Sequence, residues 1–254
     1  MPAPRLKQQL TIGQTLSKVA CNGGITSGKF GMHIGLIGGI GPAATISYYD
    51  RLVREFRKSG VPLELTIVHA DVNVLIDNAS SGLRDAQADI FAKHIRQLQG
   101  AGCDIATISA LTGHFCFAET ERVSVLPLMS SIDPIDRYCV DNGIEVLGLL
   151  GSTTVMDSRL FGRLEHTNTV IPEGGTKAVG KAYLEMASTG ICTDSAREMF
   201  FAAGAEMTTQ QGADAVLLAG TDLGLAFEGQ DPGFPAVDAL KIHVDALVDL
   251  ASKQ

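Results

Sequence analysis

Residues 33–45 read HIGLIGGIGPAAT and join a strand-like segment to the start of a helix through a glycine-rich turn. His33–Ile37 is a short apolar run typical of a buried strand, whereas Gly38–Gly41 predicts a tight turn. Pro42 suits the first position of a helix, because it has no N–H to leave unpaired there. A strand that enters a helix through glycines leaves backbone N–H groups free at the helix N-terminus, where an anion can bind. The stretch therefore predicts an α/β fold with a candidate anion site beside Gly41.

The rest of the chain alternates strand-like and helix-like segments, which is the pattern of parallel sheets covered by helices. Further strands are predicted at 63–68, 105–109, 125–129, 146–150 and 216–218, with helices at 86–99, 176–187, 195–211 and 237–251. The helix after Pro42 has apolar residues at helical spacing, namely Ile46, Tyr49, Leu52, Val53 and Phe56. Residues 69–85 read as a loop.

Two segments far apart in the chain resemble each other. Residues 102–112 and 212–221 each begin with a glycine and an aspartate, continue as an apolar strand and end in a small-residue turn with a threonine. Ligands bind beyond the carboxyl ends of the strands in open α/β sheets, so two such ends would frame one cleft. We predict two pseudo-symmetric α/β domains with the ligand cleft between them. The alternative is a chance likeness between two buried strands.

The predicted domains are 32–133 plus 236–254 and 134–235. They follow an N-terminal extension at 1–31 that has four basic residues and no acidic one. We interpret this extension as adding little to the core; a targeting peptide is the alternative.

The composition excludes several functional classes. A net charge of −8 argues against nucleic acid and against an anionic membrane surface as partners. No apolar run approaches the roughly 18–20 residues of a membrane span. The five cysteines are widely spaced, without the close pairs of a zinc site, which is typical of a reduced cytoplasmic protein without a metal site.

The glycine-rich stretch resembles the opening of the aspartate/glutamate racemase family, a strand followed by G-G-M-G-P-x-A-T, with Ile40 in place of the usual methionine. Members also show G-A-D, a strand and C-N-T-x-H in the first half, and G-A-D, a strand and G-C-T-E in the second. In that family two thiols flank the substrate α-carbon; one removes the proton and the other returns one to the far face. The resemblance extends from Met32 to the C-terminus. It implies the two-domain fold and an isomerase of amino-acid metabolism, such as an aspartate racemase, that needs no cofactor.

The departures from the family pattern fall on the catalytic atoms. Ala110 stands at the first cysteine position and Gly220 at the second, while the asparagine has become Leu111. Neither Ala nor Gly offers a titratable group, so the thiol mechanism cannot be carried over. Cys103 and Cys116 are near in sequence, but we expect both to be buried as small apolar residues.

What remains of the motifs is polar. Thr112, His114 and Thr221 match the family pattern, and Asp222 replaces the glutamate. His114 and Asp222 are candidates for the acid and base; the structural alternatives are a helix-start hydrogen bond for His114 and a helix N-cap for Asp222. Thr112 and Thr221 are candidate donors to a carboxylate.

Two further positions concern the charge of the ligand. Arg84 corresponds by position to a family arginine that grips a substrate carboxylate, with a surface ion pair as the alternative. A family lysine has no counterpart here, because Ser152 and Thr153 stand in its place. The ligand is therefore expected to carry less negative charge than aspartate, or to bind in another orientation.

The sequence predicts a racemase-like enzyme that acts on a small amino acid or carboxylate without metal or organic cofactor. The alternatives are a lyase or hydrolase that uses His114 and Asp222, or a non-catalytic carboxylate-binding protein. The predicted partners are a small ligand and no nucleic acid or membrane, with a homodimer left open.

Overall fold

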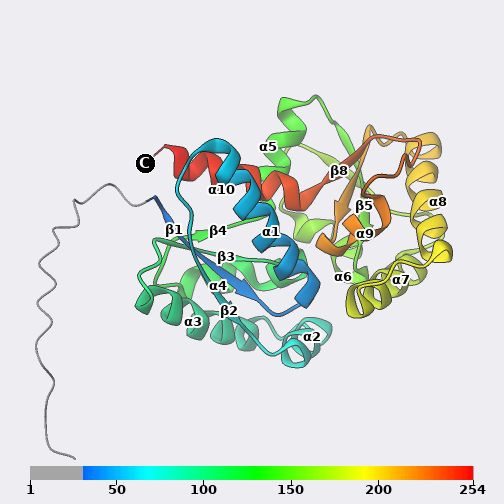
Figure 1. Cartoon of the computed structure of the whole chain (residues 1–254). Coiled ribbons are helices and arrows are strands. Elements are labelled where there is room, and N and C mark those ends of the chain that lie inside the picture. The colour runs from blue at the N-terminus through cyan, green and yellow to red at the C-terminus, as the bar shows by residue number, and fades with distance from the viewer. Residues whose placement is uncertain (1–30, 254) are drawn as a thin grey trace, which may run out of the picture.

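Two parallel sheets, one in each half of the molecule, form the framework of the computed structural model, which describes residues 31–253 (Figure 1). The first sheet has the order β2-β1-β3-β4, from β1 (His33–Gly38), β2 (Glu64–His69), β3 (Ile105–Ile108) and β4 (Leu128–Met129). The second has the order β6-β5-β7-β8, from β5 (Val146–Gly151), β6 (Asn168–Val170), β7 (Ala215–Ala219) and β8 (Ala236–Asp238). The same topology thus occurs twice, which confirms the predicted fold class. All but one residue of the expected N-terminal extension, and residue 254, lie outside the described part.

Helices connect the strands and cover the sheets (Figure 1). They are α1 (Pro42–Ser59), α2 (Val72–Ser80), α3 (Arg84–Gly100), α4 (Phe117–Val123), α5 (Asp133–Asp141), α6 (Thr153–Asp157), α7 (Thr176–Thr189), α8 (Asp194–Gln210), α9 (Gly224–Phe227) and α10 (Ala239–Ser252). Short 3₁₀ turns are η1 (Leu111–Cys116), η2 (Leu160–Gly162) and η3 (Thr221–Leu223). Within residues 31–253, no helix is both long and apolar enough to cross a membrane.

Several boundaries differ from the expectations. The segment after β2, expected as a loop, contains α2, whose N-cap Asp71 accepts a hydrogen bond from the Val74 N–H at 3.1 Å. Strands β6 and β8 were not expected, and β4 is shorter than the predicted 125–129. Because β8 pairs with β7, residues 236–238 belong to the second sheet, and the chain returns to the first half only with α10.

The first sheet is packed on both faces. On one face, Ile34 and Leu36 of β1 pack in a core shared with α1 and α10, which lie side by side in Figure 1. On the other, Ile37 packs with Phe91 and Ile95 of α3. This alternation follows from the two-residue period of a strand.

The buried face of α1 is narrower than its sequence indicates. Tyr48, Leu52 and Phe56 are buried at four-residue spacing, whereas Ile46, Tyr49 and Val53 are exposed. The apolar residues at helical spacing therefore divide into a buried and an exposed set, because α1 packs on the sheet and on α10 through one side only.

Matching aspartates support a common origin of the two halves. The Asp104 carboxylate accepts a hydrogen bond from the His33 N–H at the start of β1, at 2.8 Å. The Asp214 carboxylate likewise accepts the N–H groups of Glu145 and Val146 at the start of β5, both at 2.9 Å. The two aspartates of the repeated segments therefore hold neighbouring strands in register in the same way.

The glycine-rich turn is required by close packing at the end of β1. A Cβ on Gly38 would lie 2.5 Å from the Thr45 Oγ1 of α1, and one on Gly39 would lie 2.6 Å from the Leu75 Cδ1 of α2. Gly41, the N-cap of α1, has a φ of +75°, which glycine adopts without strain. These glycines let both helices begin close to the strand end.

Candidate functional site

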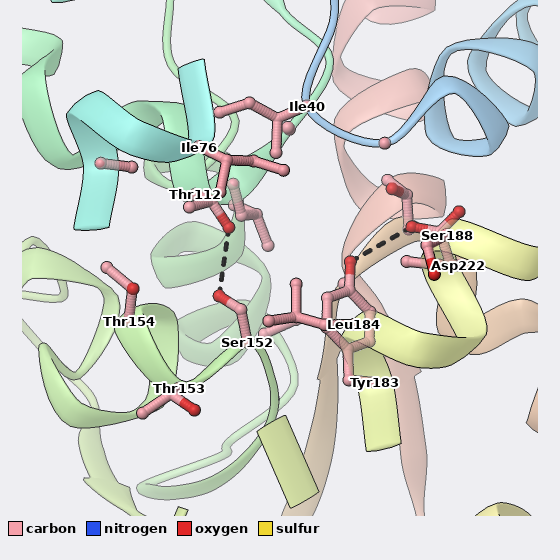
Figure 2. A pocket seen from close by; sticks show the side chains of 18 of the residues that line it. Ile40, Ile76, Thr112, Ser152, Thr153, Thr154, Tyr183, Leu184, Ser188 and Asp222 are labelled. Carbon is pink, nitrogen blue, oxygen red and sulfur yellow. Dashed lines mark hydrogen bonds between the residues drawn. The ribbon is translucent and has the colours of Figure 1, made fainter. Parts of the chain in front are cut away.

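A cavity of about 150 Å³ lies between the two halves, where the carboxyl ends of the central strands meet (Figure 2). Parallel strands present their carboxyl ends at one edge, which is where ligands bind in open α/β sheets. The cavity is lined by most of the predicted site residues: Gly41, Ala110, Thr112, Ser152, Thr153, Gly220, Thr221 and Asp222. It therefore brings together residues from four separate turns of the chain.

Hydroxyl groups connect the halves across this cavity. Thr112 Oγ1 of the first half lies 3.1 Å from Ser152 Oγ of the second, and Figure 2 shows this pair on one side of the site. Ser152 is also the N-cap of α6, since its Oγ accepts the Val155 N–H at 3.3 Å. Thr153, Thr154 and Thr221 add further hydroxyl-bearing side chains to the lining. Together they offer hydrogen-bond donors without a positive charge.

Asp222 places a carboxyl group in the cavity. Its side chain is buried, and its Oδ2 accepts a hydrogen bond from the Tyr183 hydroxyl at 3.2 Å (Figure 2). Oδ1 is buried without a hydrogen-bond partner. Burial raises the pKa of Asp222 to about 6, against the opposing effect of the Tyr183 hydrogen bond. A carboxyl group with such a pKa can both accept and return a proton near neutral pH.

His114 lies outside the cavity, contrary to the expectation that it faces the ligand. It is buried, with its ring stacked on Phe117 at a centroid distance of 5.2 Å. Its Nε2 accepts the Ser131 N–H at 3.0 Å, which leaves Nδ1 to donate to the Ala110 carbonyl at 3.1 Å. Burial lowers the pKa of His114 to about 4, so the ring is neutral at pH 7. The helix-start structural role, which the sequence left open, is the one the geometry supports.

Arg84 also lies away from the cavity. Its guanidinium is half exposed at the start of α3 and pairs with Glu119 of α4 at 3.7 Å. Val72 and Ile76 of the preceding helix α2 line the cavity, whereas Arg84 does not. No Arg, Lys or His is among the described residues that line the cavity.

No thiol among the described residues lines the cavity either. Cys103 and Cys116 are buried, as expected, and burial raises the pKa of Cys116 to about 11. Cys139 is buried as well. In residues 31–253 no three His, Cys, Asp or Glu side chains gather as metal ligands would.

The cavity contains residues that the sequence interpretation did not identify. The most important is Tyr183 of α7, and the apolar wall is formed largely by Ile40, Val72, Ile76 and Leu184. Helix α2 was expected as a loop, and the strand β6 that precedes α7 was not expected, so neither segment carried the strand-end signal that identified the threonines. The nearest cue is the glycine at position 180, one helical turn before Tyr183.

Comparisons with known proteins agree with this architecture. The sequence matches the Asp/Glu/hydantoin racemase family over residues 37–247. The fold is similar to that of an aspartate racemase homologue from Pyrococcus horikoshii, with a TM-score of 0.73, 24% identity and coverage of 87% of this chain and 99% of the other. A candidate Asp/Glu racemase from Yersinia pestis is similar with a TM-score of 0.77 and 23% identity, and the match covers 87% of this chain and 99% of the other. The aspartate racemase of Picrophilus torridus is similar with a TM-score of 0.70 and 22% identity, and the match covers 87% of this chain and 95% of the other. With its repeated sheets, its cavity between them and this match, the chain belongs to the Asp/Glu/hydantoin racemase family.

Proposed function

We propose that this protein is a racemase-family enzyme that works without a thiol pair, binding a small monocarboxylic acid and moving the proton on the carbon next to its carboxylate through Asp222. The observation that carries the proposal is the position of Asp222. Among the described residues that line the cavity, the only side chains with a titratable group are Asp222 and its hydrogen-bond partner Tyr183.

The lining favours a ligand with one negative charge. Its donors are hydroxyl groups and the N-terminus of α1, where Gly41 provides no side-chain cap. Such donors stabilise one carboxylate, whereas the second charge of aspartate or glutamate would meet no cation among the described residues that line the cavity. Two exposed lysines, Lys177 and Lys181, line only a neighbouring hollow that shares part of the cavity wall. The apolar wall of Ile40, Ile76 and Leu184 suits an uncharged substituent on the ligand.

The proton step follows from the carboxyl group. The Asp222 carboxylate takes the proton from the α-carbon, and the electron pair of the broken C–H bond moves onto the substrate carboxylate as an enediolate. Hydroxyl donors aimed at those oxygens would stabilise the added charge. The protonated Asp222 then returns a proton to the carbon. A pKa raised by burial suits both directions of this transfer.

The proposal is tested by solvent exchange. Monocarboxylic acids with 2-amino, 2-hydroxy or 2-alkyl substituents are incubated with the protein in D₂O, and loss of the α-proton is followed by NMR, with L-aspartate and L-glutamate for comparison. We expect exchange in at least one monocarboxylic acid and none in the two dicarboxylic acids.

Asp222→Asn keeps the size of the side chain and removes the base. It should lower the exchange rate by about 10²–10⁴-fold and leave the dissociation constant of the acid within a few-fold. Asp141→Asn, on the exposed end of α5, is the matched control and should exchange at the rate of the unchanged protein. Undiminished exchange in Asp222→Asn would overturn the proposal. Binding without exchange for every acid would identify a carboxylate-binding protein instead.

A further inference from the structure

The second thiol position of the family is filled by a neighbouring side chain. A Cβ built on Gly220 would lie 2.3 Å from Cε2, 2.6 Å from Cζ and 2.7 Å from the hydroxyl of Tyr183. The Tyr183 ring is buried and packs in the core of the second half. A cysteine at position 220 therefore has no room while Tyr183 keeps this conformation.

A second glycine brings Tyr183 to this place. A Cβ on Gly180 would lie 2.1 Å from Thr153 Oγ1 and 2.7 Å from the Thr153 nitrogen. Helix α7 therefore approaches the start of α6 so closely that position 180 has no room for a side chain. Tyr183 follows one turn later on α7 and so reaches the end of β7. Gly180 and Gly220 are thus both needed for the position of the ring.

Tyr183 also holds the acidic group of the cavity. Its hydroxyl donates to Asp222 Oδ2 at 3.2 Å, and the opposite oxygen, Oδ1, stays buried and unpartnered (Figure 2). The corresponding turn of the first half, Ala110 to Thr112, brings no titratable side chain to the cavity. The titratable side chains among the described residues that line the cavity therefore lie on the second-half side.

We propose that Tyr183 has taken the place of the second thiol and positions Asp222, so that the site moves protons to and from one face of the substrate only. The stereochemical part rests on the proposed function. The structural part, Tyr183 as the positioning residue, stands on the contacts of Gly180, Gly220 and Asp222.

The surroundings of Asp222 make this role measurable. Tyr183 of α7 is the titratable side chain bonded to it, while β7 and α9 carry none. On α1, Arg51 pairs with Asp238, Arg54 with Asp50 and Lys58 with Glu55. On α7, Lys181 pairs with Glu185, and Lys177 is exposed. A change at Tyr183 should therefore act on Asp222 directly.

The first experiment is an NMR titration of the Asp222 carboxyl carbon. In the unchanged protein we expect a midpoint of about 6. In Tyr183→Phe the ring still fills the site, but the bond that favours the carboxylate is lost, so the midpoint should rise by about 0.5–1 pH unit. Tyr138→Phe, on the partly exposed face of α5, is the matched control and should leave the midpoint unchanged. An equal midpoint in Tyr183→Phe would overturn the positioning role.

A double-variant cycle tests the steric part. Gly220→Cys should lower the melting temperature strongly, and the same change in a Tyr183→Ala background should lower it much less, because the clash is gone. Equal decreases in both backgrounds would overturn the assignment of Tyr183 to the thiol's place.

The stereochemical part is tested on a single enantiomer of an exchanging acid. Chiral chromatography should show deuterium uptake without appearance of the other enantiomer, and racemisation at the exchange rate would overturn it. A complete absence of exchange overturns the proposed function and with it the stereochemical part, whereas the titration and the cycle still decide the role of Tyr183.

Discussion

The turns after β3 and β7 have the same backbone plan and opposite chemistry. In both, an extended residue, Ala110 or Gly220, leads into a 3₁₀ turn. The first turn directs its titratable side chain, His114, into the protein, where both ring nitrogens are hydrogen-bonded. The second directs Asp222 into the cavity, where one oxygen has no partner. A symmetric backbone thus carries an asymmetric site.

Burial acts on both groups but with different consequences. It lowers the pKa of His114 to about 4 and raises that of Asp222 to about 6, in each case by disfavouring the charged form. The histidine is therefore fixed in one state near pH 7, while the carboxyl group is able to change state. The difference fits a structural role for His114 and, under the proposed function, a role in proton transfer for Asp222.

The largest effect should come from His114→Ala. This change removes a buried ring stacked on Phe117 and leaves the Ser131 N–H without its acceptor. We expect the free energy of unfolding to fall by about 3–5 kcal/mol, measured by urea denaturation. Exchange per folded molecule should be unchanged. A stable variant that no longer exchanges the α-proton would show that His114 acts as an acid or base. It would contradict the contrast drawn between the two turns.

A smaller effect should come from Asp222→Asn, and it depends on pH. The folded pKa of about 6 lies above the ordinary value of 3.8, so the stabilisation from Asp222 is full below 3.8 and is lost as the pH rises through 6. At pH 7.5 the buried carboxylate is a net cost, and the asparagine variant should be more stable by about 1–3 kcal/mol. At pH 3.5 this gain should vanish. A variant that is less stable at pH 7.5 would show that the carboxylate is satisfied in the folded protein.

The smallest effect should come from Arg84→Ala. Its pair with Glu119 is half exposed and 3.7 Å long, and such surface pairs contribute little. We expect a change within about 0.5 kcal/mol in the free energy of unfolding and no change in carboxylate affinity, measured by calorimetry. A tenfold loss of affinity would show that Arg84 reaches the site when ligand is bound.

Local patterns in the sequence sufficed for most of the framework. Apolar strands followed by glycine-rich or threonine-containing turns predicted both sheets, because parallel strands end at a shared edge. The shared edge and the family resemblance together predict one site for Thr112, Ser152, Thr153, Thr221 and Asp222. The absence of both thiols is likewise visible at Ala110 and Gly220.

Other features depended on how the elements pack. The His114 side chain points into the protein because the 3₁₀ turn η1 directs its ring toward Ser131. The sequence motif gives the residue at this position but not the direction of its side chain. Arg84 begins α3 and pairs with Glu119, while the preceding helix α2, whose residues read as a loop, lines the cavity. In both cases the position of the side chain depends on a neighbouring element that the motif does not describe.

The sequence by itself determined the two-fold α/β plan and the position of the cavity, because these follow from strand periodicity and turn residues. The loss of the thiols follows from the sequence together with the family motif it resembles. Only the tertiary structure decided that Tyr183 fills the second thiol's place and bonds to Asp222. Tyr183 and Asp222 are on separate elements, and their contact depends on how closely α7 approaches α6 at Gly180. The pKa of Asp222 was decided in the same way, since burial is a property of the packed molecule and not of the residue.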